Sequence, residues 1–178
     1  MDPEEQPDRL VRLAVDLVNL PDDRLDAVGL AAYLIDHGEA EPIDLTPRDV
    51  DDLARVRTEL SELFDAAGAA DRVAERVNRL LDRAQTPPWL SNHDGTAWHL
   101  HVTADEAPWA DWLAAVAGLG LARLLAEDGV ARLGRCAAPS CRRAFAGGLR
   151  NHPRRYCSPA CANRSRVAAF RARRRPAS

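Results

Sequence analysis

Four cysteines near the C-terminus place the strongest constraint on how this chain can fold. Cys136, Cys141, Cys157 and Cys161 are the only cysteines among its 178 residues, and they form a Cys-x4-Cys pair and a Cys-x3-Cys pair separated by fifteen residues. Two short chelating loops joined by one longer segment can bring four thiolates to the corners of a tetrahedron, which is the geometry that Zn2+ prefers. The spacing therefore predicts one structural zinc ion.

Two other arrangements of these cysteines remain open from the sequence. The thiols could form two disulfides, although no signal peptide is recognisable and a protein that stays in the cytoplasm normally keeps its thiols reduced. His152, which lies between the two pairs, could replace one cysteine as a ligand. Few large apolar side chains surround the cysteines, so metal binding is expected to supply much of the folding energy of this segment. We expect zinc held by four thiolates in a cytoplasmic protein.

Charge divides the chain into two unequal parts. Residues 131–178 contain thirteen arginines and no acid, whereas residues 1–130 contain eleven arginines and all twenty-seven acids, so their net charges are +13 and −16. The near-neutral total of −3 hides this separation. A basic block of such density is typical of segments that bind a polyanion, and nucleic acid is the first candidate.

The residues that follow the second cysteine pair have the pattern of a helix. Ser158 suits the N-cap and Pro159 the first helical position, and the helix can continue to about Arg175. Val167 and Phe170 share a narrow apolar stripe, which we expect to pack on the zinc site. Arginines lie on both flanks of the stripe, where they could contact phosphates or guanine edges.

Candidate contacts to nucleic acid lie just before this helix and along it. A helix of this kind can lie in or along a major groove, and the alternative is a solvated basic tail without a partner. The candidates are Arg154, Arg155, Asn163, Arg164, Arg166, Arg171 and Arg173.

Three short stretches around the cysteines carry a family resemblance. They are Cys136-x4-Cys141, then Arg154-Arg155-Tyr156-Cys157-Ser158, then Cys161-Ala162-Asn163-Arg164. Together they resemble the CGNR-type zinc finger of bacterial transcriptional regulators, which implies that the four cysteines bind zinc and that the segment binds DNA. Ala162 stands where that family has glycine, and alanine suits the start of a helix. The stretch Leu13 to Asn19 is similar to the opening of the ABATE domain that precedes this finger.

The first 130 residues have mainly helical periodicity. Apolar residues recur at helical spacing over 9–20, 22–37, 47–67, 70–84 and 108–126, and Val28 is expected to face inward in the second of these helices. A hairpin is expected around the turn residues 92–95. The last helix is the most apolar, but its length and two glycines favour a core helix over a membrane span. Four tryptophans could line a small-molecule cavity in this domain.

The sequence therefore predicts an α+β protein with two domains. Residues 1–130 form a mainly helical, ABATE-like domain with a small β-hairpin or sheet, and residues 131–178 form a treble-clef-like zinc finger with four cysteine ligands. The favoured function is a transcriptional regulator that binds duplex DNA, in which the N-terminal domain senses a signal or mediates assembly. A homodimer is expected if recognition is specific, because one finger reads few base pairs.

Two other classes of function remain open. The finger could bind RNA or another protein, because zinc-binding knuckles serve those purposes too. The N-terminal domain could bind a ligand or act as an enzyme. No catalytic triad, phosphate-binding glycine loop or paired acid motif is recognisable, so we predict that the protein is not an enzyme.

Overall fold

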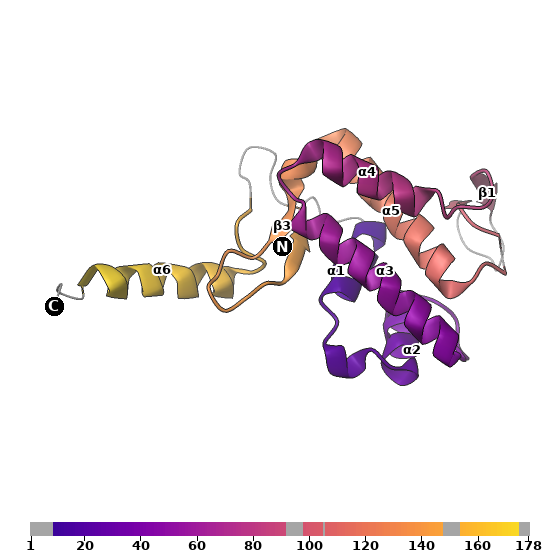
Figure 1. The fold of residues 1–178 in the computed structure, drawn as a ribbon, viewed down its shortest axis with the longest axis horizontal. Helices are drawn as coiled ribbons and strands as arrows, with labels where there is room; N and C mark the ends of the chain where they lie inside the picture. Colours follow the sequence, from indigo (N-terminus) through magenta and orange to yellow (C-terminus); the bar gives the residue numbers. More distant parts are fainter. Residues whose placement is uncertain (1–8, 92–97, 105, 148–153, 175–178) are drawn as a thin grey trace.

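The computed structural model describes residues 9–91, 98–104, 106–147 and 154–174. Within these residues a helical body carries one small hairpin at its far end, a second hairpin at its side, and a helix that projects away from it (Figure 1). The predicted α+β class is confirmed. The elements in chain order are α1 (Arg9–Val18), η2 (Asp22–Arg24), α2 (Ala27–Asp36), α3 (Pro47–Asp65), α4 (Ala70–Leu81), β1 (Trp89–Ser91), β2 (His99–His101), α5 (Trp109–Asp128), η4 (Val130–Arg132), β3 (Leu133–Arg135), β4 (Ala144–Ala146) and α6 (Pro159–Arg174).

Helix α5 is the centre of the helical body, because it packs against α1, α3 and α4. Its two glycines allow this close packing. A Cβ atom at Gly118 would lie 3.1 Å from the Cβ of Leu80 in α4, and one at Gly120 would lie 2.5 Å from the Cβ of Leu10 in α1. Among the described helices α5 alone is long and apolar enough to cross a membrane. Its contacts on three sides identify it as the predicted core helix.

Helix α3 begins where the sequence predicts. Thr46 is the N-cap, its hydroxyl accepts a hydrogen bond from the Asp49 amide, and the Asp49 carboxylate accepts one from the Thr46 amide. Pro47 occupies the first helical position, where its missing N–H has no cost. The buried face of α3 consists of Leu53, Val56, Leu60, Leu63 and Phe64.

Helix α2 turns a different face toward the core than the sequence predicts. The chain first makes the short turn η2, and α2 then begins after Asp26, whose carboxylate accepts a hydrogen bond from the Gly29 amide at 2.7 Å. This start turns Leu30 and Leu34 toward the core. Val28 lies on the opposite side and is 79% exposed, so the prediction that it faces inward was wrong.

The two hairpins have different environments. Strands β1 and β2 pair antiparallel with Leu90 opposite Leu100, while the predicted turn at 92–95 lies outside the described residues. Strands β3 and β4 pair antiparallel with Gly134 opposite Phe145. The second hairpin belongs to the main core, because β3 packs on α3 and β4 packs on α1. The start of the cysteine-rich segment is therefore joined firmly to the helical body.

The tryptophans are divided between two places. Trp109 and Trp112 pack edge to face, with ring centroids 5.7 Å apart, against the main core. Trp89 stacks on His101 in the β1–β2 hairpin, and Trp98 is 69% exposed. Their arrangement does not gather all four rings around one cavity, so a ligand of this domain stays a proposal.

Candidate zinc site and nucleic-acid interface

The four cysteine sulfurs converge on one point. All four lie within 4.8 Å of one another, with Cys157 Sγ 3.7 Å from Cys141 Sγ and 3.6 Å from Cys161 Sγ. A tetrahedral ion with Zn–S bonds of about 2.3 Å separates its ligand sulfurs by about 3.8 Å, so these distances fit zinc. None of the four cysteines forms a disulfide. The alternative ligand His152 lies outside the described residues.

Backbone hydrogen bonds place the first cysteine pair in a tight loop between β3 and β4. The amide of Cys136 donates to the carbonyl of Arg143 at 2.9 Å, and the amide of Cys141 donates to the carbonyl of Ala138 at 2.9 Å. A third bond, from the Ala137 amide to the Arg155 carbonyl at 2.8 Å, attaches this loop to the segment that carries the second pair. These bonds hold the two pairs in reach of one ion.

The start of α6 supplies the last ligand. Ser158 accepts a hydrogen bond from the Cys161 amide at 3.2 Å through its hydroxyl, and one from the Ala162 amide at 3.1 Å through its carbonyl, so it acts as the predicted cap. Cys161 lies in the first turn with its side chain buried. Ala162 is an ordinary helical residue here, so alanine in place of the family's glycine causes no strain.

The thiols of the site do not ionise alike. The hydrogen bond with Ser158 is the largest cause that lowers the pKa of the Cys161 thiol, to about 6. Burial, followed by hydrogen bonds with the neighbouring thiols, raises the pKa of the Cys157 thiol to about 12. Zinc binds thiolates, so binding must release the proton of Cys157.

Two of the predicted nucleic-acid residues lie against the zinc site. Arg164 donates from NH2 to the sulfur of Cys161 at 2.9 Å. Arg154 donates from Nε to the carbonyl of Tyr156 at 2.8 Å and from NH2 to the carbonyl of Cys157, and its guanidinium lies 5.7 Å from the centre of the Phe145 ring. Four thiolates around one Zn2+ carry a net charge of −2, which these two cations partly compensate.

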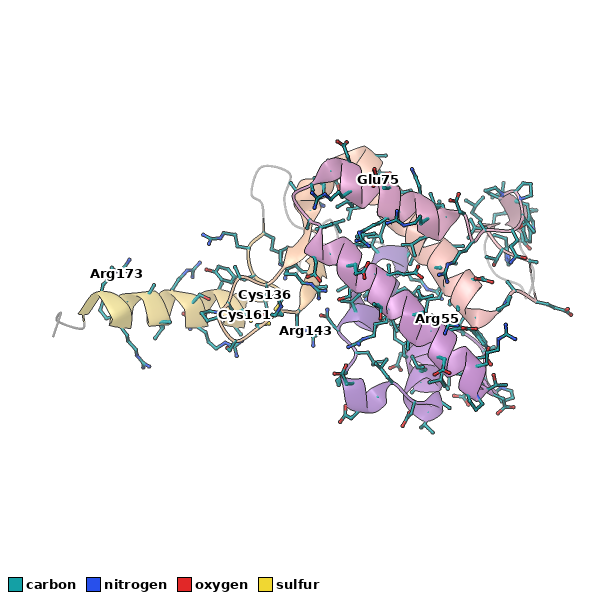
Figure 2. The ribbon with its side chains drawn as sticks, viewed as in Figure 1. Arg55, Glu75, Cys136, Arg143, Cys161 and Arg173 are labelled. Carbon is teal, nitrogen blue, oxygen red and sulfur yellow. The ribbon has the colours of Figure 1, made fainter. Side chains whose placement is uncertain are left out.

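The other predicted contacts point to solvent. Arg155, Asn163, Arg166, Arg171 and Arg173 are all exposed, and no ion pair joins any of these four arginines to another described residue. Figure 2 shows Arg173 at the end of α6 that is remote from the helical body. The basic charge of α6 is therefore not neutralised within the described part of the chain.

The apolar stripe of α6 is also exposed. Val167 is 40% exposed and Phe170 is 51% exposed, so the prediction that they pack on the zinc site was wrong. The apolar contacts of the site come instead from Tyr156 and from Ala138. The physical reason is direction: α6 leaves the site along a line that points away from the body, so only its first turn can contact the cysteines (Figure 1).

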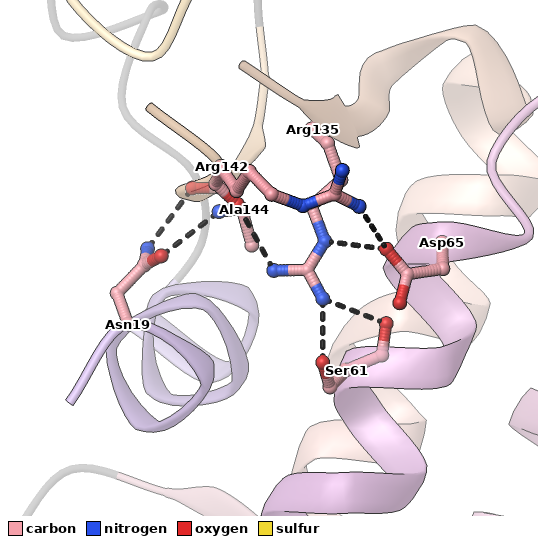
Figure 3. A network of polar contacts seen from close by, with 6 residues as sticks. All are labelled: Asn19, Ser61, Asp65, Arg135, Arg142 and Ala144. Carbon is pink, nitrogen blue, oxygen red and sulfur yellow. Dashed lines mark hydrogen bonds and ion pairs between the residues drawn. The ribbon is translucent and has the colours of Figure 1, made fainter. Parts of the chain in front are cut away.

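Asn19 joins α1 to the root of the finger, which sequence reasoning did not find. Its side-chain amide donates to the carbonyl of Ala144 at 2.9 Å, and its side-chain oxygen accepts from the amide of Ala144 at 2.8 Å (Figure 3). The side chain thus pairs with β4 as a neighbouring strand would. The partner is 125 residues away in the sequence, and the only available signal was a polar residue at the end of an apolar helix.

Arg135 makes the second connection, to α3. Its Nε donates to the carboxylate of Asp65 at 2.9 Å, and its NH2 donates to the carbonyl and hydroxyl of Ser61 (Figure 3). Its side chain is only 19% exposed. Arg132 also forms an ion pair with an acid of the body, because its NH2 lies 3.2 Å from the carboxylate of Asp128. Arginines at the root of the finger are therefore neutralised by acids of the body.

Comparison with known protein families gives two matches along the chain. One family model, described as the CGNR zinc finger, matches residues 132–174. A second, ABATE, described as a putative stress-induced transcription regulator, matches residues 11–135. No curated protein matches the chain. Neither family description names an enzyme.

The matched ranges run from the first turn of α1 to the end of α6, and the finger model includes all four converging cysteines. The site holds one structural zinc ion. The chain belongs to the ABATE family, which is described as a putative stress-induced transcription regulator, and carries a CGNR zinc finger.

Proposed function

We propose that this protein is a cytoplasmic transcription regulator that binds duplex DNA through α6 of its zinc finger. The observation that carries the proposal is the projecting helix itself, in which Arg166, Arg171 and Arg173 are exposed and have no acidic partner among the described residues. Nucleic acid phosphates supply the missing negative charge. The zinc ion fixes the start of the helix, so the finger can present it in one orientation.

The exposed face of α6 has the composition of a surface that reads bases. At 100° per residue Asn163 and Val167 lie on the same side as Phe170, while Arg166 and Arg173 follow one flank and Arg164 and Arg171 the other. In a major groove, asparagine pairs with adenine, and apolar side chains contact the methyl group of thymine. Arginines on the flanks are then close to the two phosphate backbones. This role also accounts for the exposure of the apolar stripe.

The proposal is tested by fluorescence anisotropy of a labelled duplex titrated with the full chain. Contact with about five phosphates gives a slope of roughly −4 to −5 for the logarithm of the association constant against the logarithm of salt concentration. We expect R166Q/R171Q/R173Q to reduce the slope by about 3. The matched control is R48Q/R72Q/R79Q, which removes three exposed arginines of the body and should leave the slope unchanged.

Other outcomes separate the remaining classes of function. Zinc chelation should abolish binding, because the orientation of α6 depends on Cys161. Equal or tighter binding to single-stranded RNA of matched length would favour an RNA-binding finger. Absence of salt-dependent binding to any nucleic acid would contradict the proposal and favour a finger that binds protein.

The helical body has the remaining role in this proposal. It receives a signal or mediates assembly, with a small-molecule ligand as one signal and a homodimer as the expected assembly if recognition is specific. Light scattering of the purified protein with and without the duplex measures the number of chains that bind together.

A further inference from the structure

A cleft of about 560 Å³ lies between α1 and the zinc finger. Its charged side chains are Arg12 and Asp16 from α1, and Arg143, Arg154 and Arg164 from the finger. Four cations and one acid therefore face the same space. Figure 2 shows Arg143 at the junction of the finger and the body, close to the labelled cysteines. The cleft is cationic, although α1 belongs to the acidic part of the chain.

Two of the four cations are available to a ligand. Arg12 and Arg143 are exposed, and neither makes an ion pair with another described residue. Arg154 and Arg164 contribute charge, but their guanidinium groups are held by the carbonyls and the sulfur of the zinc site. The arrangement thus has two cations held by the zinc site and two exposed ones without an acidic partner among the described residues.

Asp16, the one acid of the cleft, interacts with a histidine of α2. The carboxylate of Asp16 lies 3.3 Å from Nε2 of His37 on α2, whose Nδ1 is 2.8 Å from the carbonyl of Tyr33. The imidazole is thus held between the carboxylate and a backbone carbonyl. When His37 carries its proton, the negative charge of Asp16 is compensated. This pairing leaves the arginines as the dominant charge of the cleft.

The position of Arg12 relative to the finger is fixed by the packing of α1. Residues 12, 16 and 19 are spaced by four and three, so Arg12, Asp16 and Asn19 follow one edge of α1. All three line the cleft. The two hydrogen bonds of Asn19 with Ala144 attach this edge to β4, so Arg12 and the finger form one surface.

We propose that this cleft binds the phosphate backbone of DNA, so that α1 of the ABATE domain contacts the duplex together with α6. The inference rests on the proposed function and adds a second element to it. Phosphate oxygens accept hydrogen bonds from guanidinium groups in bidentate geometry, and the cleft offers two such groups within a cationic surrounding. The ABATE domain is then part of the DNA-binding surface as well as the receiver of a signal.

The test is the salt dependence of duplex binding by the full-length variant R12Q/R143Q. We expect the slope to fall by about 2 and the affinity at low salt to fall roughly tenfold or more. Arg12→Lys keeps the charge and should keep the slope of the unmodified chain. The matched control is R48Q/R72Q, which removes the same charge from exposed positions away from the cleft. Equal zinc content and equal thermal midpoints show that the variants are folded.

The outcomes distinguish this inference from the proposed function. If R12Q/R143Q leaves the salt slope unchanged while R166Q/R171Q/R173Q reduces it, the cleft does not bind phosphate and the role of α6 still stands. A loss of slope in R12Q/R143Q but not in R48Q/R72Q supports the cleft. If the unmodified chain does not bind duplex DNA at all, both proposals are wrong.

Discussion

The two halves of the zinc finger use their arginines differently. The β3–β4 hairpin is docked on the body, with Leu133, Ala144 and Ala146 in the main core and Arg135 bound to Asp65. Helix α6 begins at the same zinc site but projects away from the body, and its described arginines have no acidic neighbour. One half is an attachment, and the other is a charged surface.

This difference shows that the arginines of a basic segment cannot all be assigned to nucleic-acid binding. Arg132 and Arg135 serve the attachment, Arg154 and Arg164 lie at the metal site, and the exposed arginines of α6 are Arg166, Arg171 and Arg173. The physical variable is the distance to an acid, which only the packing of the chain determines.

The largest effect is expected from loss of a zinc ligand. Cys157→Ala leaves three thiolates, and we expect its zinc content to fall from one ion per chain to near zero after dialysis against a chelator, because structural zinc needs a closed four-ligand site. DNA binding should be lost with it, while the helical body remains folded. Zinc content and circular dichroism measure the two effects. Ser140→Ala in the same loop is the control and should keep its zinc.

The next effect concerns the connection between β3 and α3. Arg135→Ala removes the hydrogen bonds to Asp65 and Ser61, and we expect the free energy of unfolding to fall by about 2 kcal/mol, mostly from the bonds to Ser61, because Asp65 is 49% exposed and solvent screens its charge. The measurement is urea denaturation with saturating zinc. Arg142→Ala is a matched control, because Arg142 also approaches Asp65, at 3.7 Å, but is 86% exposed. A loss as large in the control would contradict this account.

A smaller loss is expected at the α1 connection. Asn19→Ala leaves the buried amide and carbonyl of Ala144 without their partners, which should lower the free energy of unfolding by about 1–2 kcal/mol. The variant should keep its zinc, because Asn19 does not touch a cysteine. Native-state hydrogen exchange at Ala144 should become faster than in the unmodified chain. If exchange at Ala144 stays unchanged, the connection through Asn19 is not important for docking.

The smallest effect should come from the pair of His37 and Asp16. The hydrogen bond with Asp16 is the largest cause that raises the pKa of His37 above its usual value. A raised folded pKa means that the pair stabilises the protein below about pH 6.5 and that this stabilisation is lost as pH rises through the folded pKa.

Asp16→Asn should therefore reduce the free energy of unfolding more at about pH 6 than at about pH 9, by less than about 1 kcal/mol because the carboxylate is 43% exposed. Denaturation curves of both chains at the two pH values provide the measurement. A difference that is the same at both values would show that the histidine is not involved. Zinc content is measured in parallel, because thiolate ligands also respond to pH.

Local chemistry was predictable from the sequence alone. The spacing of the four cysteines specified the zinc site, because chelate loops of three and four residues restrict where a thiolate can lie. Thr46, Pro47 and Asp49 specified the start of α3 by capping its first turn, and Ser158 did the same for α6. The segregation of charge was a property of composition and needed no structure. These features depend on residues close to one another in the chain.

Long-range contacts were decided only by the tertiary structure. Asn19 and Ala144 are 125 residues apart, and nothing in the sequence near either residue predicts a contact with the other. Val28 and Phe170 have apolar side chains at helical spacing, but the start of α2 and the direction of α6 expose both. Periodicity specifies which residues share a helix face, and only the packing of the elements specifies whether that face meets the core, a zinc site or solvent.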